Sequence, residues 1–507
     1  MTMSMRPRFL LLLAVAAALV LPASAAAGAG MFVGAAEDAG RSDDLTQAYA
    51  KLELARLAGF DTVRMTSIWA PGLSRPTDHE LDVLRTSALA ARLNGIRIIL
   101  SVYQRDNHTT PLTAAARTQF ASYVATIAAE APDISDFIIG NEPNLNLFWM
   151  PQFDQRGRTV SAGAYLKLLA ATYDALKAVS PDVNVIGGSV SPRGSDRAFG
   201  IRPTHSPTRF IAELGAAYRK SGRTTPVMDA FAFHPYLIPS RLPPTFRFKN
   251  PKNTTIALSD YDKLTRALAG AFDGTAQPGS TLPIVYDEFG YQSQIPADKR
   301  DAYSNLDSTA AADAIPEALQ ASYYRAALAI AQCQPNVTGM LIFHVTDEAN
   351  AKAWQSGVYY ADDTPKSSLP AVRDAALAAR EGTLARCAAR STKAVNVLDT
   401  LTLPSGGSYA PLDSWRVDLT CTRACTYSAR VVDTAPWTPP SALRLLLPST
   451  ATGTVAPNEA ASAELPAMGL DPGAYQVVVR VFETGRPGTA VVRTSDPLVV
   501  VAPPPDE

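Results

Sequence analysis

Two glutamates stand at similar places in the sequence. Glu142 follows the apolar run 137–140 within Asn141-Glu142-Pro143, and Glu288 follows the second run, 284–287. Hydrolysis of a glycosidic bond needs one carboxylic acid to protonate the leaving oxygen and a second carboxylate that faces the anomeric carbon. Two acids at strand ends could supply both groups. The pattern therefore predicts a pair of acids that acts on a sugar bond.

Other polar side chains also follow apolar runs that have the length of strands. They are Arg64, Gln104, Asn141, His234, Tyr236 and His344. Asp287 precedes Glu288, so strand alternation predicts that it points to the opposite face and is structural. We expect the other polar residues to gather at one end of a sheet.

Eight candidate strands would position these residues. They lie at 31–34, 62–65, 97–102, 137–139, 183–186, 230–233, 283–286 and 340–343. Helical periodicity covers 45–55, 112–131, 161–179, 208–220, 259–271, 316–332 and 369–390. The alternation predicts an α/β fold, a closed (β/α)8 TIM barrel at 28–391, whose active site lies at the carboxyl ends of the strands. No glycine-rich turn follows the first strand, which disfavours a dinucleotide-binding sheet.

The sequence pattern of the chain changes at about residue 392. Helical periodicity stops, and short alternating runs such as 415–419, 427–431 and 475–481 follow. They predict an antiparallel, immunoglobulin-like β-sandwich at 392–507 with a proline-rich tail. This domain could bind carbohydrate or support the barrel by packing. Trp415 and Trp437 do not decide between these roles.

The first 27 residues have the pattern of a signal peptide. Arg6 and Arg8 precede an apolar stretch at 9–21, and small residues at 23–25 suit a signal peptidase. We expect export and a secreted protein with no stable membrane association after cleavage. A retained membrane anchor is the alternative.

Four cysteines fit an oxidising compartment. Their order suggests the bridges Cys333–Cys387 and Cys421–Cys425, although four cysteines allow three pairings. A zinc site is the weaker alternative, since no histidine follows Cys425. The 507 residues carry a formal net charge of -1, which gives no reason to expect a nucleic acid or another polyanion as partner.

Taken together, these motifs resemble the clan A glycoside hydrolases, which are retaining (β/α)8 enzymes. The segment 140–145 followed by Phe148-Trp149 resembles family 39, and His234-Pro235-Tyr236 is closer to family 5. The resemblance covers about residues 30–380. It implies that Glu142 is the general acid/base and Glu288 the nucleophile.

The resemblance also implies binding roles. Asn141 would bind the sugar 2-hydroxyl, Arg64 would brace Glu288, and Tyr236 would orient it. His234 is assigned to substrate binding beside Tyr236.

Two positions depart from the family pattern. Gln104 replaces a histidine, and His344 stands where family 5 usually has a tryptophan. Trp149 and Trp354 are expected to stack on sugar faces, while Trp69 is open between a core and a binding role.

The expected function is a secreted retaining glycoside hydrolase, acting on β-O-glycosidic bonds of plant or microbial polysaccharides or oligosaccharides. We expect a monomer without metal or cofactor. The alternative is a carbohydrate-binding or wall-associated protein that uses the same barrel without turnover.

Overall fold

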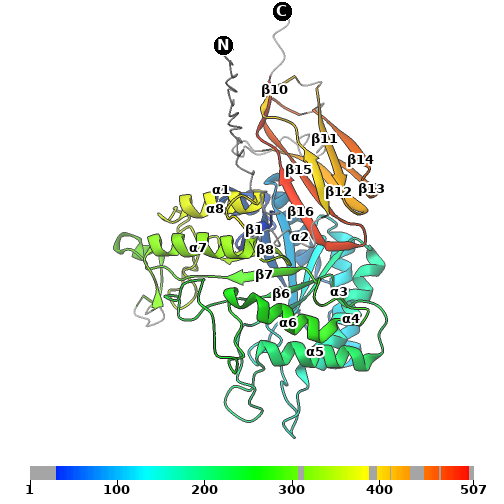
Figure 1. Ribbon diagram of the computed structural model, residues 1–507. Coiled ribbons are helices and arrows are strands. Elements are labelled where there is room, and N and C mark those ends of the chain that lie inside the picture. Colours follow the sequence, from blue (N-terminus) through cyan, green and yellow to red (C-terminus); the bar gives the residue numbers. More distant parts are fainter. Residues whose placement is uncertain are drawn as a thin grey trace, which may run out of the picture.

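The computed structural model describes residues 30–306, 313–387, 397–410, 413–433, 450–467 and 470–501. Figure 1 shows a barrel surrounded by helices, with a set of antiparallel strands above it. The expected signal segment, the expected domain boundary at 391/392 and Trp437 lie outside the described residues.

Eight parallel strands close the barrel. They are β1 (Phe32–Ala36), β2 (Thr62–Trp69), β3 (Arg97–Gln104), β4 (Asp136–Ile139), β5 (Asn184–Val190), β6 (Ala230–Phe233), β7 (Ile284–Phe289) and β8 (Val337–Phe343). Each strand pairs with the next, and β1 pairs with β8. The predicted (β/α)8 barrel is confirmed.

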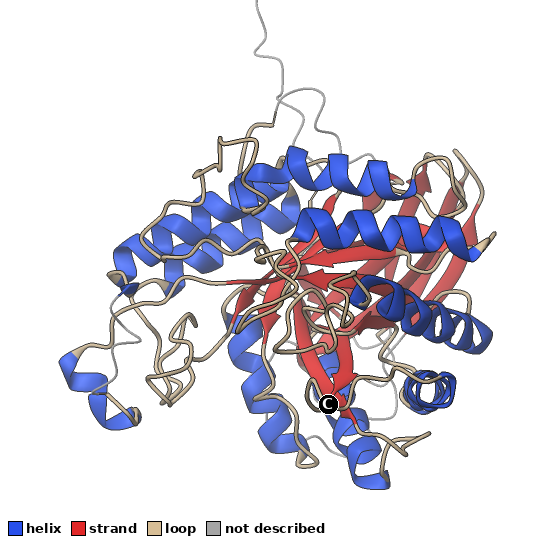
Figure 2. Cartoon of the chain, turned by 90° about the horizontal axis from the view of Figure 1, so that it is seen from below, coloured by secondary structure: helices blue, strands red, loops and turns tan. Residues whose placement is uncertain are grey.

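Helices cover the outside of the barrel, as the view from below shows (Figure 2). They are α1 (Leu45–Leu57), α2 (Asp78–Leu93), α3 (Ala114–Glu130), α4 (Ser161–Val179), α5 (Pro207–Ser221), α6 (Tyr261–Phe272), α7 (Glu317–Gln332) and α8 (Leu369–Glu381). The sequence analysis did not predict α2, although Thr77 caps it by accepting a hydrogen bond from the Glu80 amide. Helix α8 ends earlier than expected because Gly382 adopts the left-handed conformation there.

The C-terminal strands form two facing sheets. They are β9 (Leu398–Thr402), β10 (Gly407–Tyr409), β11 (Ser414–Cys421), β12 (Cys425–Asp433), β13 (Thr450–Val455), β14 (Ala460–Pro466), β15 (Gly473–Glu483), β16 (Arg486–Thr494) and β17 (Leu498–Val500). One sheet has the order β14-β11-β9, and the other contains β10-β17-β15-β12-β13 with β16 beside β15. The predicted sandwich is confirmed, with one parallel pair, β10 and β17. Trp415 is 1 % exposed in its core, so it offers no stacking face.

The sandwich packs against the amino-terminal end of the barrel. Asp136, the first residue of β4, forms ion pairs with Arg97 and with Arg480 of β15, the latter at 3.7 Å. Arg380 of α8 donates a hydrogen bond to Thr494 of β16 at 3.2 Å. This arrangement leaves the carboxyl ends of the barrel strands free of the sandwich.

Both expected disulfides are present. Cys333, directly after α7, is joined to Cys387 in the segment that follows α8, and Cys421 at the end of β11 is joined to Cys425 at the start of β12. Within the described ranges, no helix has the length and apolarity to cross a membrane, and no group of three or more His, Cys, Asp or Glu side chains could hold a metal ion.

Candidate active site

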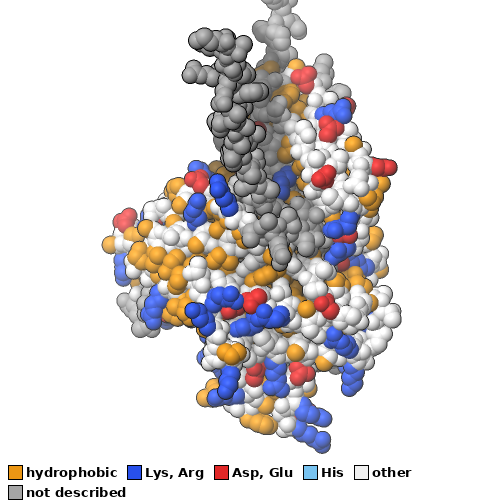
Figure 3. Space-filling view, viewed as in Figure 1, with side chains coloured by type: hydrophobic (Ala, Val, Ile, Leu, Met, Phe, Trp, Pro, Cys, Tyr) orange, Lys and Arg blue, Asp and Glu red, His pale blue; other side chains and the backbone are white. Residues whose placement is uncertain are grey.

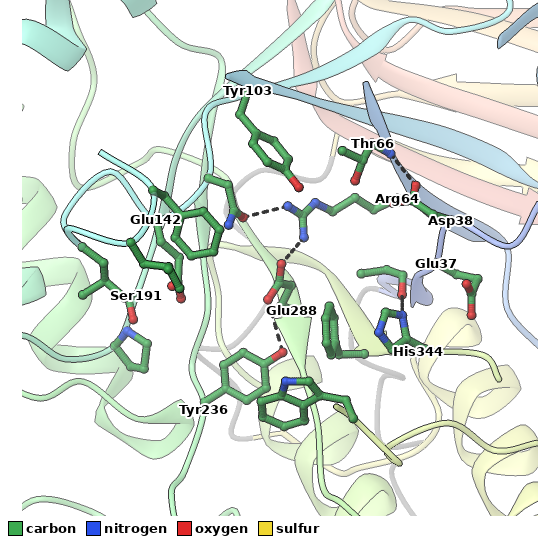
Figure 4. Close-up of a pocket in the computed structure, with 18 of the residues that line it drawn as sticks. Glu37, Asp38, Arg64, Thr66, Tyr103, Glu142, Ser191, Tyr236, Glu288 and His344 are labelled. Carbon is green, nitrogen blue, oxygen red and sulfur yellow. Dashed lines mark hydrogen bonds and ion pairs between the residues drawn. The ribbon is translucent and has the colours of Figure 1, made fainter. Parts of the chain in front are cut away.

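Glu288 lies at the end of β7 and is held by two neighbouring side chains. The guanidinium of Arg64, from β2, donates a hydrogen bond to Glu288 Oε1. The hydroxyl of Tyr236, in the loop after β6, donates to Glu288 Oε2 at 3.3 Å. Figure 4 shows both contacts converging on the carboxylate from opposite sides. Glu288 is therefore fixed in orientation with a cation beside it.

Arg64 also orients Asn141. Its Nη2 donates to Asn141 Oδ1 at 2.9 Å and to Ser101 Oγ at 3.1 Å. With its oxygen occupied, the Asn141 side chain presents its amide nitrogen as the group that can donate to a ligand. One arginine thus connects Glu288 with Asn141.

Glu142 is presented by an unusual backbone conformation. Its φ is 37°, in the left-handed region that non-glycine residues rarely adopt, and Gly140 before it has φ 88°. The Glu142 amide donates to Ser189 O at 2.8 Å, and Ser189 itself has φ 49°. Strained residues of this kind persist where the surrounding structure fixes them, and they cluster at functional sites. The ends of β4 and β5 therefore hold Glu142 in place together.

His234 lies between the two glutamates. Its Nδ1 is 3.0 Å from Glu142 Oε1 and 3.4 Å from Glu288 Oε2. These two oxygens can be separated by no more than the total of these distances, about 6.4 Å. The imidazole is fully buried. The sequence analysis assigned His234 to substrate binding, but its ring is enclosed and contacts the two acids instead.

Asp287 belongs to the same network, contrary to the expectation that it would point away. It is fully buried, accepts a hydrogen bond from Ser189 Oγ at 2.8 Å, and lies 3.2 Å from His234 Nε2. Its Oδ2 is also 3.7 Å from Arg64 Nε. The register of β7 against β8 shifts between Tyr286 and Phe289, so simple alternation fails at this strand end. Asp287 and Glu288 can therefore both serve one cluster.

The charges in this cluster shift one another's pKa values. Burial by itself lowers the pKa of His234. The charges of Glu288 and Asp287 and the hydrogen bonds to Asp287 and Glu142 outweigh this effect and bring the pKa to about 10. Burial raises the pKa of Asp287, yet His234, Arg64 and Ser189 bring it below its usual value. His234 is thus an imidazolium that donates from both nitrogens at neutral pH.

A cavity of about 430 Å³ opens above these groups. Trp354, in the loop after β8, lines it and packs against Tyr236 at a ring distance of 5.2 Å. Phe343, at the end of β8, packs edge-on against Trp354 at 5.5 Å. These three rings form an apolar wall beside Glu288, and the stacking of Trp354 on a sugar stays a prediction.

Another part of the cavity wall is acidic. Glu37 and Asp38, which follow β1, line it together with Thr66 and Tyr103 (Figure 4). Their carboxylates accept hydrogen bonds from backbone amides, Asp38 from Thr66 at 2.7 Å and Glu37 from Thr346 at 3.3 Å. The sequence analysis missed both acids. Their position directly after the first expected strand was the signal that could have revealed them.

His344 also lines this side of the cavity. Its Nδ1 lies 2.8 Å from Ala36 O, and its Nε2 is 3.7 Å from Glu348. Burial lowers the pKa of His344, but Glu348, Glu37 and the Ala36 carbonyl raise it above its usual value. His344 therefore holds a proton more readily than an ordinary histidine on this side of the cavity.

Trp149 does not face the cavity, so the expectation that it stacks on a sugar is wrong. It is 1 % exposed and packs edge-on against Tyr165 at 5.7 Å. Its amide donates to Leu145 O at 3.0 Å, closing a turn that leaves Leu147 and Phe148 lining the cavity. The ring beneath this turn is covered on both faces.

Two other residues turn out to have structural roles. Trp69 is fully buried and packs against Phe120 at 5.6 Å, so it belongs to the core. Gln104 donates its side-chain amide to Phe148 O. It therefore positions the loop that borders the cavity.

Comparisons with known proteins gave similarities in structure alone. No family model matches the chain, and no curated protein matches it. The GH39 enzyme from Xanthomonas axonopodis pv. citri is similar at 16% identity and a TM-score of 0.44, over 90% of this chain and 95% of that one. A glucosidase from Croceicoccus marinus is similar at 11% identity and a TM-score of 0.47, over 90% and 96%.

A monomeric β-xylosidase from Caulobacter crescentus CB15 is also similar, at 14% identity and a TM-score of 0.42, over 90% of this chain and 98% of that one. Similarity at these levels does not assign an activity to this chain. Its function is therefore derived from its own residues.

Proposed function

We propose that this protein is a secreted retaining glycoside hydrolase that cleaves β-O-glycosidic bonds of plant or microbial polysaccharides or oligosaccharides by double displacement. The observation that carries the proposal is the bridge that His234 Nδ1 makes between Glu142 and Glu288. Retaining enzymes place their two carboxyl groups about 5–5.5 Å apart, and the bound of about 6.4 Å on the two bridged oxygens is compatible with that spacing.

Charge balance supports distinct roles for the two acids. Two buried cations, Arg64 and His234, face three carboxyl groups in the cluster. Glu288 accepts hydrogen bonds from Arg64 and Tyr236, which suits the attacking carboxylate and leaves the acid/base role to Glu142. Glu142 Oε1 accepts from His234, so its other oxygen can deliver a proton to the leaving group.

In the proposed reaction, Glu288 attacks the anomeric carbon while Glu142 protonates the departing oxygen. The glycosyl-enzyme that forms is then hydrolysed by a water molecule that Glu142 deprotonates, and Glu288 leaves. Tyr236 holds the attacking carboxylate, and Trp354 offers an apolar face to the sugar ring. No step requires a metal or cofactor. Export is proposed as well, since two disulfides suit an oxidising compartment.

A panel of chromogenic aryl β-glycosides tests the proposal. The wild type should hydrolyse at least one of them, and Glu288→Ala should abolish turnover because the covalent step is lost. Glu142→Ala should slow substrates with poor leaving groups about 10²-fold or more and activated aryl glycosides far less. Near wild-type rates in both variants would refute the assignment. Binding of sugars without turnover by the wild type would favour the carbohydrate-binding alternative.

A further inference from the structure

Two loops at the carboxyl end of the barrel carry a concentrated positive charge. Residues 193–203, between β5 and α5, contain three arginines and one aspartate. Residues 238–255, between β6 and α6, contain four basic residues and no acidic residue. The whole chain has a formal net charge of -1. We call these two loops the basic rim.

The basic rim borders the active-site cavity. Arg193 and Ile238 line the cavity together with Glu142 and Glu288. The loops meet at their bases, where the Ile256 amide donates to Pro192 O at 3.0 Å. Figure 3 shows Lys and Arg side chains on the lowest part of the molecule, below α5 and α6 of Figure 1, as well as elsewhere on this face. A chain that leaves the cavity on this side must cross the rim.

Most of the rim's cations are not neutralised by the protein. Arg241 pairs with Asp313 and Arg247 with Asp262. The structure, over the residues that it describes, records no ion pair for the other five, which are Arg193, Arg197, Arg202, Lys249 and Lys252. All five are exposed. They keep their charge available for a ligand.

The rim also exposes apolar side chains. Ile201 is 98 % exposed, Phe199 74 % and Ile238 51 %. Apolar side chains among cations suit a ligand with both charged groups and apolar faces, as sugar rings have. A purely ionic partner would not need them.

The interior of the cavity has the opposite charge. Glu37 and Asp38 line it, and Arg64, which also lines it, is already paired with Glu288. A carboxylate or sulfate on the reacting sugar would be repelled there, whereas the same groups on neighbouring sugars would meet the rim. The charge pattern therefore separates a neutral reacting sugar from an anionic remainder of the chain.

We propose that the basic rim binds an anionic glycan, a sugar chain with carboxylate or sulfate groups beyond the reacting residue. This inference rests on the proposed function, because it places that chain across the same active site. The expected ligand is a carbohydrate with a row of anionic groups, which the unpaired Arg and Lys side chains of the rim would bind. The net charge of -1 gave no reason to expect such a partner, because it sums over the whole chain.

Binding to defined polymers tests the inference, using the full chain as Glu288→Ala to prevent cleavage. The probes are polygalacturonate for carboxylates, dextran sulfate for sulfates, neutral dextran, and polyglutamate as a polyanion without sugars. At least one anionic glycan should bind tenfold or more tightly than both dextran and polyglutamate. The preference over dextran should vanish near 1 M salt, where the screening length is about 3 Å.

Matched variants locate the binding. Changing Arg197, Arg202, Lys249 and Lys252 together to Gln should weaken the anionic glycan tenfold or more. The control changes four exposed basic residues elsewhere, Lys167, Lys220, Arg325 and Arg386, to Gln and should leave affinity within twofold. Equal losses in both variants would overturn the inference. So would equal binding of polyglutamate, or binding to phosphatidylglycerol vesicles without binding to either anionic glycan.

Turnover separates this inference from the proposed function. In the wild-type background, the four rim substitutions should leave turnover of small neutral aryl glycosides unchanged, because those substrates do not reach the rim. Turnover without preferential glycan binding would overturn the rim inference alone. Rim-dependent glycan binding without any turnover would overturn the hydrolase and retain the binding surface.

Discussion

His234 contacts both candidate catalytic acids. Its Nδ1 faces Glu142 and Glu288, and its Nε2 faces Asp287. The pKa of His234, at about 10, lies above the ordinary value of 6.5. The stabilisation from the charged imidazole is therefore fully present below pH 6.5 and is lost as the pH rises through about 10. Asp287 acts through this histidine as a positioning residue.

Asp287→Asn should lower the pKa of His234, because one of the carboxylates that raise it becomes neutral. We expect a decrease of at least about one unit, typical for removal of an opposite charge at this distance. NMR titration of the imidazole would measure it, and the alkaline limb of the kcat profile should move in the same direction. Ser189→Ala, which removes a hydrogen bond but no charge, is the control. An unchanged His234 titration in Asp287→Asn would refute this role.

The closeness of the two acids also predicts the stereochemistry. Retaining enzymes hold the two carboxyl groups about 5–5.5 Å apart, where no water fits between the nucleophile and the sugar, so we predict that two inversions retain the anomeric configuration. Proton NMR of the first product released from a β-glycoside should show the β-anomer before mutarotation. An initial α-anomer would contradict the double displacement and leave hydrolysis by a single inversion as the mechanism.

At the scale of elements, a buried ion pair supports the loop that carries Trp354. Lys366 Nζ lies 2.7 Å from Asp347 Oδ1, and both side chains are almost fully buried. Asp347 also accepts from the Tyr303 hydroxyl at 2.8 Å and the Gly357 amide at 2.9 Å. These contacts join the two ends of the loop after β8. These contacts therefore hold in place the loop that brings Trp354 to the cavity wall.

Lys366→Met should destabilise the protein by about 3–5 kcal/mol, because Asp347 would remain buried without its partner. Urea unfolding would measure the free energy. The double variant Lys366→Met with Asp347→Leu should recover part of the loss, since no unpaired charge remains. Should the single variant cost less than about 1 kcal/mol, the pair would not anchor this loop.

For the whole molecule, Asp136 is the point where barrel and sandwich share charges. Burial raises the pKa of Asp136, but Arg97 of β3 and Arg480 of β15 outweigh it and bring the pKa to about 2. A lowered pKa contributes stability that is present above pH 3.8 and is lost as the pH falls through about 2. Burial likewise lowers the pKa of Arg480, which Asp136 opposes, to about 10. The contact between the domains therefore depends on an ionised carboxylate.

Asp136→Asn should cost about 3–5 kcal/mol, because Arg97 and Arg480 would be buried without a counter-charge. Its loss of stability between pH 4 and pH 2 should also be smaller than that of the wild type. Thermal unfolding across this pH range would show both effects. Glu53→Gln, which breaks the surface pair with Arg56 at 3.0 Å, should cost less than about 1 kcal/mol. Equal losses of stability in the two variants would show that Asp136 contributes no more to stability than a surface carboxylate does.

The sequence by itself determined the barrel and the placing of its main polar residues. Strand and helix periods are local properties, and the carboxyl ends of parallel strands must meet at one end of the barrel. Arg64, Asn141, Tyr236 and Glu288 could therefore be grouped before any coordinates. The same argument assigned Glu142 to this group, because it follows the strand β4.

The tertiary structure alone decided which groups touch. The register shift in β7 brought Asp287 into the cluster, and the closing of the barrel placed His234 between two acids that lie far apart in the chain. A turn buried Trp149 while Trp354 lined the cavity. The net charge of the chain did not reveal the basic rim, because positive and negative residues cancel when they are summed over the whole sequence. The segments 193–203 and 238–255 are each basic, and folding brings them together. Contacts between distant segments depend on geometry that no local pattern encodes.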